Sequence, residues 1–202
     1  MSRKSNTEAR RAEIVEAMLA VMAQQGYEKA TIQAVAKQAG LAPGLIHYHF
    51  KSKQEILLAL VQAIARYAQQ RYQTALGEAQ APVARLQAYL NAQLGLGEGA
   101  APQMVAAWVM IGAEAVRQAE VREVYQTVIA AELASLTQMM GDCLVEAGRS
   151  RAAAPDLAAG LLALMTGAFQ LSSAAQAVMP TGYAAEAAIA YAVNGIAAAP
   201  QA

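Results

Sequence analysis

Apolar residues recur at intervals of three or four positions through most of this chain, which is the spacing of an α-helix that buries one face. Ile14, Met18 and Val21 show this spacing near the N-terminus. No segment alternates strictly between apolar and polar residues, as a half-buried strand would. Alanine, the strongest helix former, dominates the composition. The sequence therefore predicts an all-α fold.

Glycine and proline residues divide the chain into about nine expected helices. Glycine commonly ends a helix, and proline fits the first helical position because no amide hydrogen is needed there. The expected helices cover about residues 7–25, 31–39, 43–50, 52–75, 82–94, 102–115, 120–147, 155–178 and 184–198. We place the domain boundary at the start of the fourth helix. Residues 1–53 then form a three-helix domain, and residues 54–202 form a larger helical bundle coupled rigidly to it.

The two parts differ in the sign of their charge, although the whole chain is neutral. Residues up to Glu55 include eight basic and five acidic side chains, a net charge of +3, and the remainder carries −3. Every lysine lies at or before Lys53. A basic module joined to an acidic body is typical of a polyanion-binding domain, although a bias of three charges is also small enough to arise by chance.

The chain is unusually apolar, with 56% hydrophobic and 15% charged residues. This composition predicts a subunit interface or an internal cavity. No charged residue occurs from Leu157 to Ala185, so a membrane-spanning helix is a competing interpretation. Polar residues dilute the run, Pro180 and Gly182 interrupt it, and no aromatic belt flanks it. We therefore expect a helix packed in a bundle or a dimer interface, and no membrane partner.

Cys143 is the single cysteine, so the chain forms no internal disulfide, which fits a reducing cytosol. The N-terminus begins with basic residues, but Glu13 and Glu16 interrupt the first apolar stretch. We therefore expect no secretion signal and a cytoplasmic location.

The segment TIQAVAKQAGLAPGLIHYHF, from Thr31 to Phe50, predicts two short helices joined by a tight turn. Thr31 is suited to cap the first helix, Gly40 to close it, and Pro43 to begin the second. Two short helices joined in this way form the helix-turn-helix of DNA-binding proteins.

The second of these helices has an unusual outer face. Ile46 and Phe50 are expected to point inward, which leaves His47, Tyr48 and His49 to face outward beside two lysines. Aromatic and imidazole groups in such a position suit contacts with bases and phosphates in the major groove. Plain surface or core residues of a small helical domain are the simpler alternative.

The two histidines do not predict a metal site or an enzyme. Residues two apart on a helix point about 200° apart, so His47 and His49 do not converge on one ion. A di-iron enzyme built on a helix bundle needs Glu-x-x-His pairs, and neither histidine follows a glutamate by three positions. We expect no metal, no cofactor and no catalytic activity.

A longer stretch, AVAKQAGLAPGLIHYHFKSKQEILLAL, resembles the N-terminal signature of the TetR family of bacterial regulators, with a match over about residues 10–61. Its Gly-Leu-Ile-His-Tyr-His-Phe segment is most similar to the branch that contains the choline-responsive Bet repressor. The rest of the chain resembles the family only in helix count, length and apolar ends. The resemblance implies a DNA-binding, ligand-responsive repressor that acts as a homodimer on a palindromic operator.

The resemblance also implies roles for individual residues. Thr31 and Lys53 match phosphate-binding positions, and His47 stands where the family most often has tyrosine. Histidine is shorter than tyrosine and titrates near neutral pH, so that contact is expected to differ. The implied DNA-binding residues are Thr31, Ala42, Pro43, Gly44, Leu45, His47, Tyr48, His49 and Lys53.

Family members dimerise through their last two long helices, here about residues 155–178 and 184–198. Small residues in the first of these would permit close helix approach, namely Gly160, Ala163, Gly167, Ala168 and Ala174. An unidentified small-molecule effector is expected to bind among the middle helices. The candidate effector-binding residues are Tyr67, Tyr89, Met104, Trp108, Glu114, Arg117 and Gln170. Ordinary core packing of these residues, and a bond from Gln170 across the dimer, are the alternatives.

A helix-turn-helix protein can also activate transcription or organise DNA, and the sequence does not separate these functions from repression. The position of the operator relative to the promoter would separate them.

Overall fold

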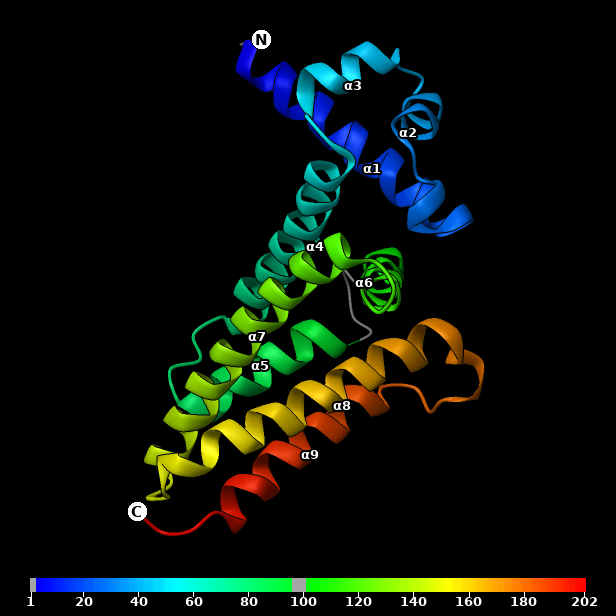
Figure 1. Ribbon diagram of the computed structural model, residues 1–202. Helices are drawn as coiled ribbons and strands as arrows, with labels where there is room; N and C mark the ends of the chain where they lie inside the picture. Colours follow the sequence, from blue (N-terminus) through cyan, green and yellow to red (C-terminus); the bar gives the residue numbers. More distant parts are fainter. Residues whose placement is uncertain (1–2, 96–100) are drawn as a thin grey trace. The chain divides into compact units, whose positions relative to one another are not determined.

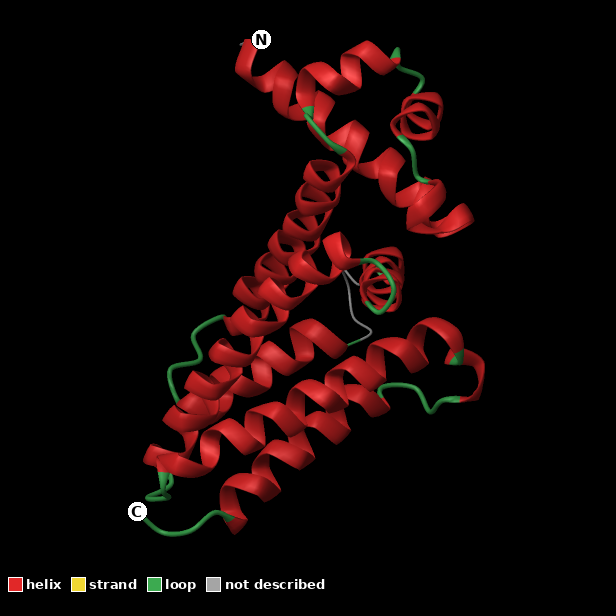
Figure 2. Ribbon diagram, in the orientation of Figure 1, coloured by secondary structure: helices red, strands yellow, loops and turns green. Residues whose placement is uncertain are grey.

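The structure, a computed structural model, describes residues 3–95 and 101–202. Within these ranges it consists of helices joined by turns and loops (Figures 1 and 2). The described α-helices are α1 (Arg3–Lys29), α2 (Ile32–Ala39), α3 (Pro43–His49), α4 (Lys53–Leu76), α5 (Pro82–Leu94), α6 (Pro102–Ala115), α7 (Ala119–Glu146), α8 (Ala154–Ala174) and α9 (Tyr183–Ala198). Two short 3₁₀ helices, Arg151–Ala153 and Gln176–Val178, flank α8. The expected all-α fold is confirmed for the described residues. Gly97 and Gly99 of the expected glycine-rich break lie outside them.

The chain forms two compact units. The first comprises Met1–Arg66 and Ala107–Gln126, and the second comprises Tyr67–Ala106 and Thr127–Ala202. We call them the N-terminal unit and the C-terminal unit. The N-terminal unit thus takes in the end of α6 and the start of α7, which a division at residue 53 assigns to the other part. The predicted boundary between residues 53 and 54 separates a DNA-binding domain from an effector-binding domain. It stays a prediction, because the two compact units are defined by packing and not by function.

In the N-terminal unit, α1 presents a stripe of buried residues that includes Ile14, Met18 and Val21. Gln25, the next position at that spacing, is exposed. Gly26 has a φ of 79°, which interrupts the helix as expected, but helical structure resumes through Lys29. The side chain of Tyr27 is buried in the core, and this burial favours the extra turn.

The short helices are delimited by the expected caps. The Thr31 Oγ1 accepts a hydrogen bond from the Ala34 N–H at 3.1 Å, and Gly40 ends α2 in the left-handed conformation. At α4, the Ser52 Oγ accepts from the Glu55 N–H at 3.1 Å. The Glu55 carboxylate accepts a hydrogen bond from the Lys51 N–H at 2.7 Å. In a regular capping box it would accept from the N–H of Ser52, one residue later. Local side chains thus fix the limits of α2 and α4.

The C-terminal unit is built around α5, α8 and α9, which pack against one another (Figure 1). Its core includes Leu86, Leu90, Leu136, Met140 and Leu161. The largest buried aliphatic side chains come from α5, α7 and α8, whereas α9 contributes mainly alanine. Small residues let α8 and α9 approach closely, and Gly160 lies directly against the Tyr191 ring.

The uncharged helix ends earlier than the sequence predicts. It was expected to reach Val178, but α8 ends at Ala174, and Ala175 leaves the helical conformation with a φ of −138°. The Ser172 hydroxyl donates to the Phe169 carbonyl at 3.1 Å. Serine side chains compete in this way with the backbone hydrogen bonds of a helix, which explains the early end.

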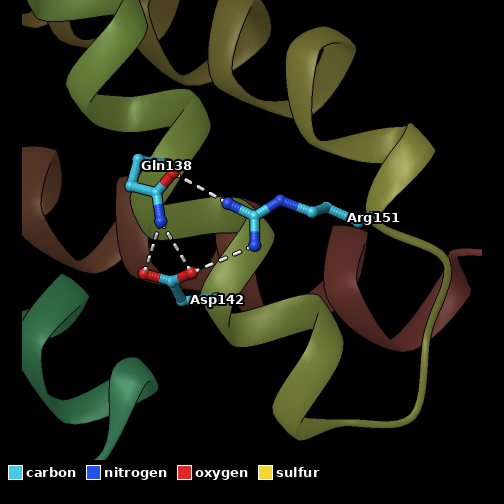
Figure 3. A network of polar contacts seen from close by, with 3 residues as sticks. All are labelled: Gln138, Asp142 and Arg151. Carbon is cyan, nitrogen blue, oxygen red and sulfur yellow. Dashed lines mark hydrogen bonds and ion pairs between the residues drawn. The ribbon is translucent and has the colours of Figure 1, made fainter.

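A polar network joins the end of α7 to the turn that leads into α8 (Figure 3). The Arg151 guanidinium donates to the Gln138 side-chain oxygen at 2.8 Å and to Asp142 at 3.2 Å. Gln138 also donates to Asp142 at 2.9 Å. The guanidinium lies against Gly141, where any side chain would collide with it. Since these groups are largely exposed, the network orients the turn more than it stabilises the fold.

Two segments, Ala119–Glu146 and Arg151–Ala174, are long and apolar enough to cross a membrane by length and composition alone. This is weak evidence, because core helices of soluble proteins share those properties. Cys143 is buried on α7, and burial, reinforced by Glu146 and Asp142, raises the pKa of its thiol to about 11. A thiol with so little thiolate character is unreactive at neutral pH.

Candidate functional site

Helix α3 exposes one face and buries the other. Ile46 and Phe50 are fully buried, whereas Tyr48 is 74% exposed and His47 is exposed beside it. The helix has seven residues and packs against both α1 and α2. A helix this short does not persist alone in water, so the packing of its buried side holds the exposed side in place.

The residues at the start of α3 leave the backbone open. Ala42, Pro43 and Gly44 are exposed, and nothing lies within 4 Å of where a side chain at Gly44 would begin. Leu45 is 36% exposed. The predicted contact residues from Ala42 to Leu45, with His47 and Tyr48, are therefore all accessible to a partner. Thr31 is also exposed, and its hydroxyl hydrogen stays available because the capping bond uses only the oxygen.

His49 is less exposed than His47. Its side chain is half-buried, its Nδ1 is buried with no hydrogen-bond partner among the described residues, and its ring meets Tyr48 edge to face at 5.0 Å between ring centres. The expectation that His49 faces outward like His47 is therefore met only in part. The reason is helical geometry, because two residues at 100° each carry a side chain to the other side of the helix.

Lys53 is engaged within the protein. Its Nζ donates to the carbonyl oxygens of Tyr27 at 2.5 Å and Glu28 at 3.3 Å, and lies 3.8 Å from the centre of the Tyr27 ring. Burial lowers the pKa of Lys53, while the charges of Glu120, Glu114 and Glu28 oppose that effect. The phosphate-binding role of Lys53 stays a prediction, and it would require the ammonium group to leave or share these carbonyls.

Tyr27, which contacts Lys53, is itself buried. Burial raises the pKa of the Tyr27 hydroxyl, and the nearby Glu120 carboxylate raises it further. The hydroxyl makes no well-formed hydrogen bond among the described residues. Lys53 thus holds the end of α1 to the start of α4 through the backbone carbonyls and the ring face of Tyr27.

Two other lysines of the N-terminal unit are exposed. Lys37 lies in the last turn of α2, and Lys51 follows α3 directly. The sequence indicates these two lysines only through the fact that every lysine of the chain lies before residue 54. Lys37 in particular was not singled out, because a lysine on a short amphipathic helix is most often an ordinary surface residue.

The candidate effector-binding residues fall into both units. In the N-terminal unit, Trp108 stacks on Tyr125 with ring centres 4.9 Å apart. Glu114 is buried and pairs through Oε1 with Arg117 at 3.2 Å, while its Oε2 has no partner. Arg117 is largely exposed. The Glu114 carboxylate lies beside Gly26, so it bears on the interrupted turn of α1.

In the C-terminal unit, Tyr89 belongs to a buried acid–tyrosine cluster formed by Tyr72, Tyr89 and Glu132. The Tyr89 hydroxyl donates to the Glu132 carboxylate, and the rings of Tyr72 and Tyr89 meet edge to face at 5.4 Å. The Tyr72 hydroxyl is buried without a partner. Burial raises the pKa of Glu132, and burial followed by the Glu132 charge raises the pKa of Tyr89.

Tyr72 and Glu132 were missed by the sequence analysis. An acidic residue between alanines and Leu133 on an otherwise apolar stretch of α7 was the available signal for Glu132. The other candidates of this unit lie differently. Met104 and Tyr67 are half-buried, and Gln170 is exposed on the single chain. Among residues 6–95 and 101–202, no group of three or more histidines, cysteines or acids gathers as a metal site would.

These features define a helix-turn-helix protein of the regulator class. Two family models match the chain. The model of bacterial regulatory proteins of the tetR family matches residues 14–60, and that of the BetI-type transcriptional repressor C-terminal region matches residues 82–198. The chain therefore belongs to the tetR family of bacterial transcriptional regulators, with a C-terminal region of the BetI type. The family resemblance and the expectation of a non-enzymatic regulator are confirmed.

Individual relatives agree with this assignment. The HTH-type transcriptional regulator BetI of Rhizobium meliloti is 33% identical over 113 residues, which cover 56% of this chain and 55% of that protein. The fatty acid metabolism regulator protein of Bacillus subtilis is 42% identical over 48 residues, or 24% of this chain and 25% of that protein. The chain thus spans about half the length, or less, of the curated relatives that it matches.

Solved structures share the fold at low identity. A transcriptional regulator from Pseudomonas aeruginosa superposes with a TM-score of 0.80 at 23% identity, covering 95% of this chain and 92% of that one. A transcriptional regulator from Saccharomonospora viridis, in complex with choline, has a TM-score of 0.69 at 21% identity, with 95% and 97% coverage.

The Lys53 contacts lead to a stability prediction. Replacing Lys53 with methionine keeps the aliphatic stem and removes the ammonium group, so two backbone carbonyls lose a charged donor. We expect the free energy of unfolding to fall by about 1 kcal/mol or more. Lys51→Met, at an exposed position, should stay within about 0.5 kcal/mol of the parent protein. Urea unfolding measures both changes, and equal stability of the two variants would contradict the role given to Lys53.

Proposed function

We propose that this protein is a transcriptional repressor that binds its operator DNA through α3 as a homodimer and is released by a small-molecule effector. The observation that carries the proposal is the one-sided α3, with His47 and Tyr48 exposed above buried Ile46 and Phe50. Membership of the tetR family supports it. Such a protein acts where the chromosome lies, so we place it in the cytoplasm.

The exposed groups fit the chemistry of double-stranded DNA. Tyr48 and His47 offer ring edges, a hydroxyl and imidazole nitrogens that reach base edges and the thymine methyl group in a major groove. Lys37 and Lys51 supply positive charge for the phosphates, and phosphate contacts provide much of the affinity. Thr31 adds a hydroxyl hydrogen for a phosphate oxygen.

The dimer is proposed to form through α8 and α9. On α8, the exposed positions Ala159, Ala163, Gly167, Leu171 and Ala174 follow one helical face and carry no charge. Three of the five small residues predicted for the interface lie on this face, whereas Gly160 is half-buried and Ala168 is buried. A wide face of small and apolar residues suits close packing against the same face of a second subunit.

Helix α9 presents a similar face. Ala187, Ala190, Val193 and Ala197 are exposed at helical spacing, and Val193 is 42% exposed. Gln170 lies on the corresponding face of α8, where a bond across the dimer would satisfy its amide. In a dimer, two copies of α3 would enter successive major grooves about 34 Å apart on a two-fold symmetric operator.

We propose a small organic cation as the effector, with the acid–tyrosine cluster as its site. Glu132 is a half-buried carboxylate whose described hydrogen bond comes from a neutral tyrosine, and a negative charge partly withdrawn from water gains from a cation. Ring faces of tyrosines also attract quaternary ammonium groups. The BetI-type match, and the choline bound by the Saccharomonospora regulator, support this class of ligand.

Release would follow from a difference in affinity. A ligand shifts an equilibrium only toward the state that it binds better, so the effector must favour the arrangement of the two DNA-binding units that does not fit the operator.

The DNA-binding proposal is tested by footprinting the DNA upstream of the gene with the purified protein at moderate salt. We expect a two-fold symmetric protected site of one to two helical turns. Tyr48→Ala should weaken specific binding about tenfold, comparable to one mismatched base pair, and Tyr48→Phe separates the ring from its hydroxyl. Unchanged affinity of Tyr48→Ala would contradict the contact assigned to α3. The position of the protected site relative to the promoter distinguishes repression from activation.

The dimer proposal is tested by sedimentation. The parent protein should sediment at twice the chain mass of 21.1 kDa. Val193→Asp places a charge in the proposed interface and should give monomers, because a buried unpaired charge is costly. Val116→Asp is the matched control, since Val116 is 75% exposed and lies outside α8 and α9. Dissociation of the control with a dimeric Val193→Asp would contradict the assignment.

The effector proposal is tested by titrating operator complexes with choline and following DNA release by fluorescence anisotropy. Glu132→Gln keeps the shape and removes the charge, so operator binding should persist while release needs at least about tenfold more choline. Glu146→Gln, an exposed acid of the same helix, is the control.

Because the pKa of Glu132 is raised, release of the parent complex should also weaken as the pH falls toward that pKa and the carboxyl becomes neutral. If choline has no effect on the parent complex, the ligand class is wrong. If the parent and Glu132→Gln complexes respond equally, the site is wrong.

A further inference from the structure

Two neighbouring arginines of α1 have different environments. Arg10 binds Glu13 of the same helix, with Nη1 2.5 Å from Oε2, in a pair that is partly open to solvent. Arg11 instead reaches out of α1 and contacts α3 and α4. The two residues have the same side chain and sit on the same helix of a DNA-binding unit, so the contrast lies in what each one binds.

Arg11 makes three contacts with one guanidinium group. Its Nη1 donates a hydrogen bond to the backbone carbonyl of His49. Its Cζ lies 3.9 Å from the centre of the Phe50 ring. Its Nη2 lies 3.8 Å from the Glu55 Oε1. Only a planar group with several donors forms all three contacts at once, and a lysine ammonium does not.

The first contact holds the end of α3. His49 is the last residue of that helix, and Phe50 leaves it with a φ of −139° and a ψ of 129°. The last carbonyls of a helix have no partner within the helix and carry partial negative charge, so a guanidinium group both satisfies and stabilises them. The bound carbonyl belongs to the residue directly after Tyr48, so Arg11 bears on the orientation of the exposed face.

The third contact holds the turn that follows α3. The carboxylate of Glu55 faces Arg11 through Oε1 and accepts from the Lys51 N–H through Oε2 at 2.7 Å. The N–H of Glu55 itself is bound by Ser52. Arg11 therefore connects α1 to both ends of the α3–α4 turn, and the Phe50 ring between them is fully buried.

We propose that Arg11 is a positioning residue for DNA recognition: it orients His47 and Tyr48 toward the bases and does not neutralise a phosphate. The inference rests on the proposed DNA-binding function and assigns Arg11 a part in specificity. A basic residue on α1 of such a unit would ordinarily be taken for a phosphate contact. The inward contacts of Arg11 point to the other role.

The two roles differ in a measurable way. A phosphate contact strengthens binding to all DNA and contributes about 0.9 to the slope of log affinity against log salt concentration. A positioning residue contributes to discrimination between sequences, since it acts through the groups that read the bases.

The test compares Arg11→Ala, Arg11→Lys and the matched control Arg10→Ala with the parent protein. Affinities are measured for the operator and for unrelated DNA of equal length at several salt concentrations. We expect Arg11→Ala to lower the operator-to-unrelated affinity ratio about tenfold without changing the salt slope. Arg11→Lys should restore only part of the ratio, and Arg10→Ala should leave it unchanged.

A second measurement separates local orientation from general unfolding. Backbone amide NMR signals of Tyr48 to Phe50 should shift in Arg11→Lys while those of the C-terminal unit stay in place. A salt slope reduced by about 0.9, with an unchanged ratio, would overturn the proposal in favour of a phosphate contact. Loss of folding in both Arg11 variants would also overturn it.

A parent protein that binds all DNA equally would refute the proposed function itself. An unchanged ratio in Arg11→Ala beside a selective parent refutes only the role of Arg11.

Discussion

Burial of Ile46 and Phe50 is the interaction on which the exposed face of α3, the proposed DNA-binding surface, depends. Helix α3 is too short to be stable alone, so these side chains, fully buried in the N-terminal unit, determine which residues face outward. Tyr48 is exposed because Ile46 and Phe50, two positions away on either side, point into the core. Arg11 donates to a backbone carbonyl at the end of α3, and Lys53 donates to one near the end of α1. Each thereby holds a helix end in place. These two basic residues thus serve the fold as well as the charge of the surface.

In the C-terminal unit the main constraint is the amount of apolar surface that has to be covered. Its helices α8 and α9 bury one alanine-rich side against each other and α5, and leave small, uncharged faces uncovered. A chain with 56% hydrophobic residues leaves such faces exposed unless a second subunit covers them. The α8 and α9 faces are apolar groups exposed to solvent, whereas the acid–tyrosine cluster places polar groups inside an apolar unit. The carboxylate of Glu132 is hydrogen-bonded by Tyr89, and burial raises its pKa.

Much of this could be predicted from the sequence because local interactions decide it. The caps at Thr31 and Ser52, the glycine at residue 40 and the buried pair of α3 follow from residue types at fixed spacing. The sequence did not indicate the partners of Lys53 or the exposure of Gln170. Both depend on which distant segment packs alongside, and periodicity does not contain that information. Glu132 and Tyr72 were missed for the same reason, since both contact Tyr89 only in the folded unit and 43 positions separate Tyr89 from Glu132.

The most direct test of the account is selection of bound sequences from a random pool of double-stranded DNA, with the parent protein and Tyr48→Ala in parallel. The account predicts that the parent protein enriches a two-fold repeat whose half-sites are centred about one helical turn apart, or a multiple of it, and that Tyr48→Ala loses preference at specific base pairs within each half-site. Enrichment of no common sequence by the parent protein, or of the same sequences by both proteins, would contradict the claim that the exposed face of α3 reads DNA.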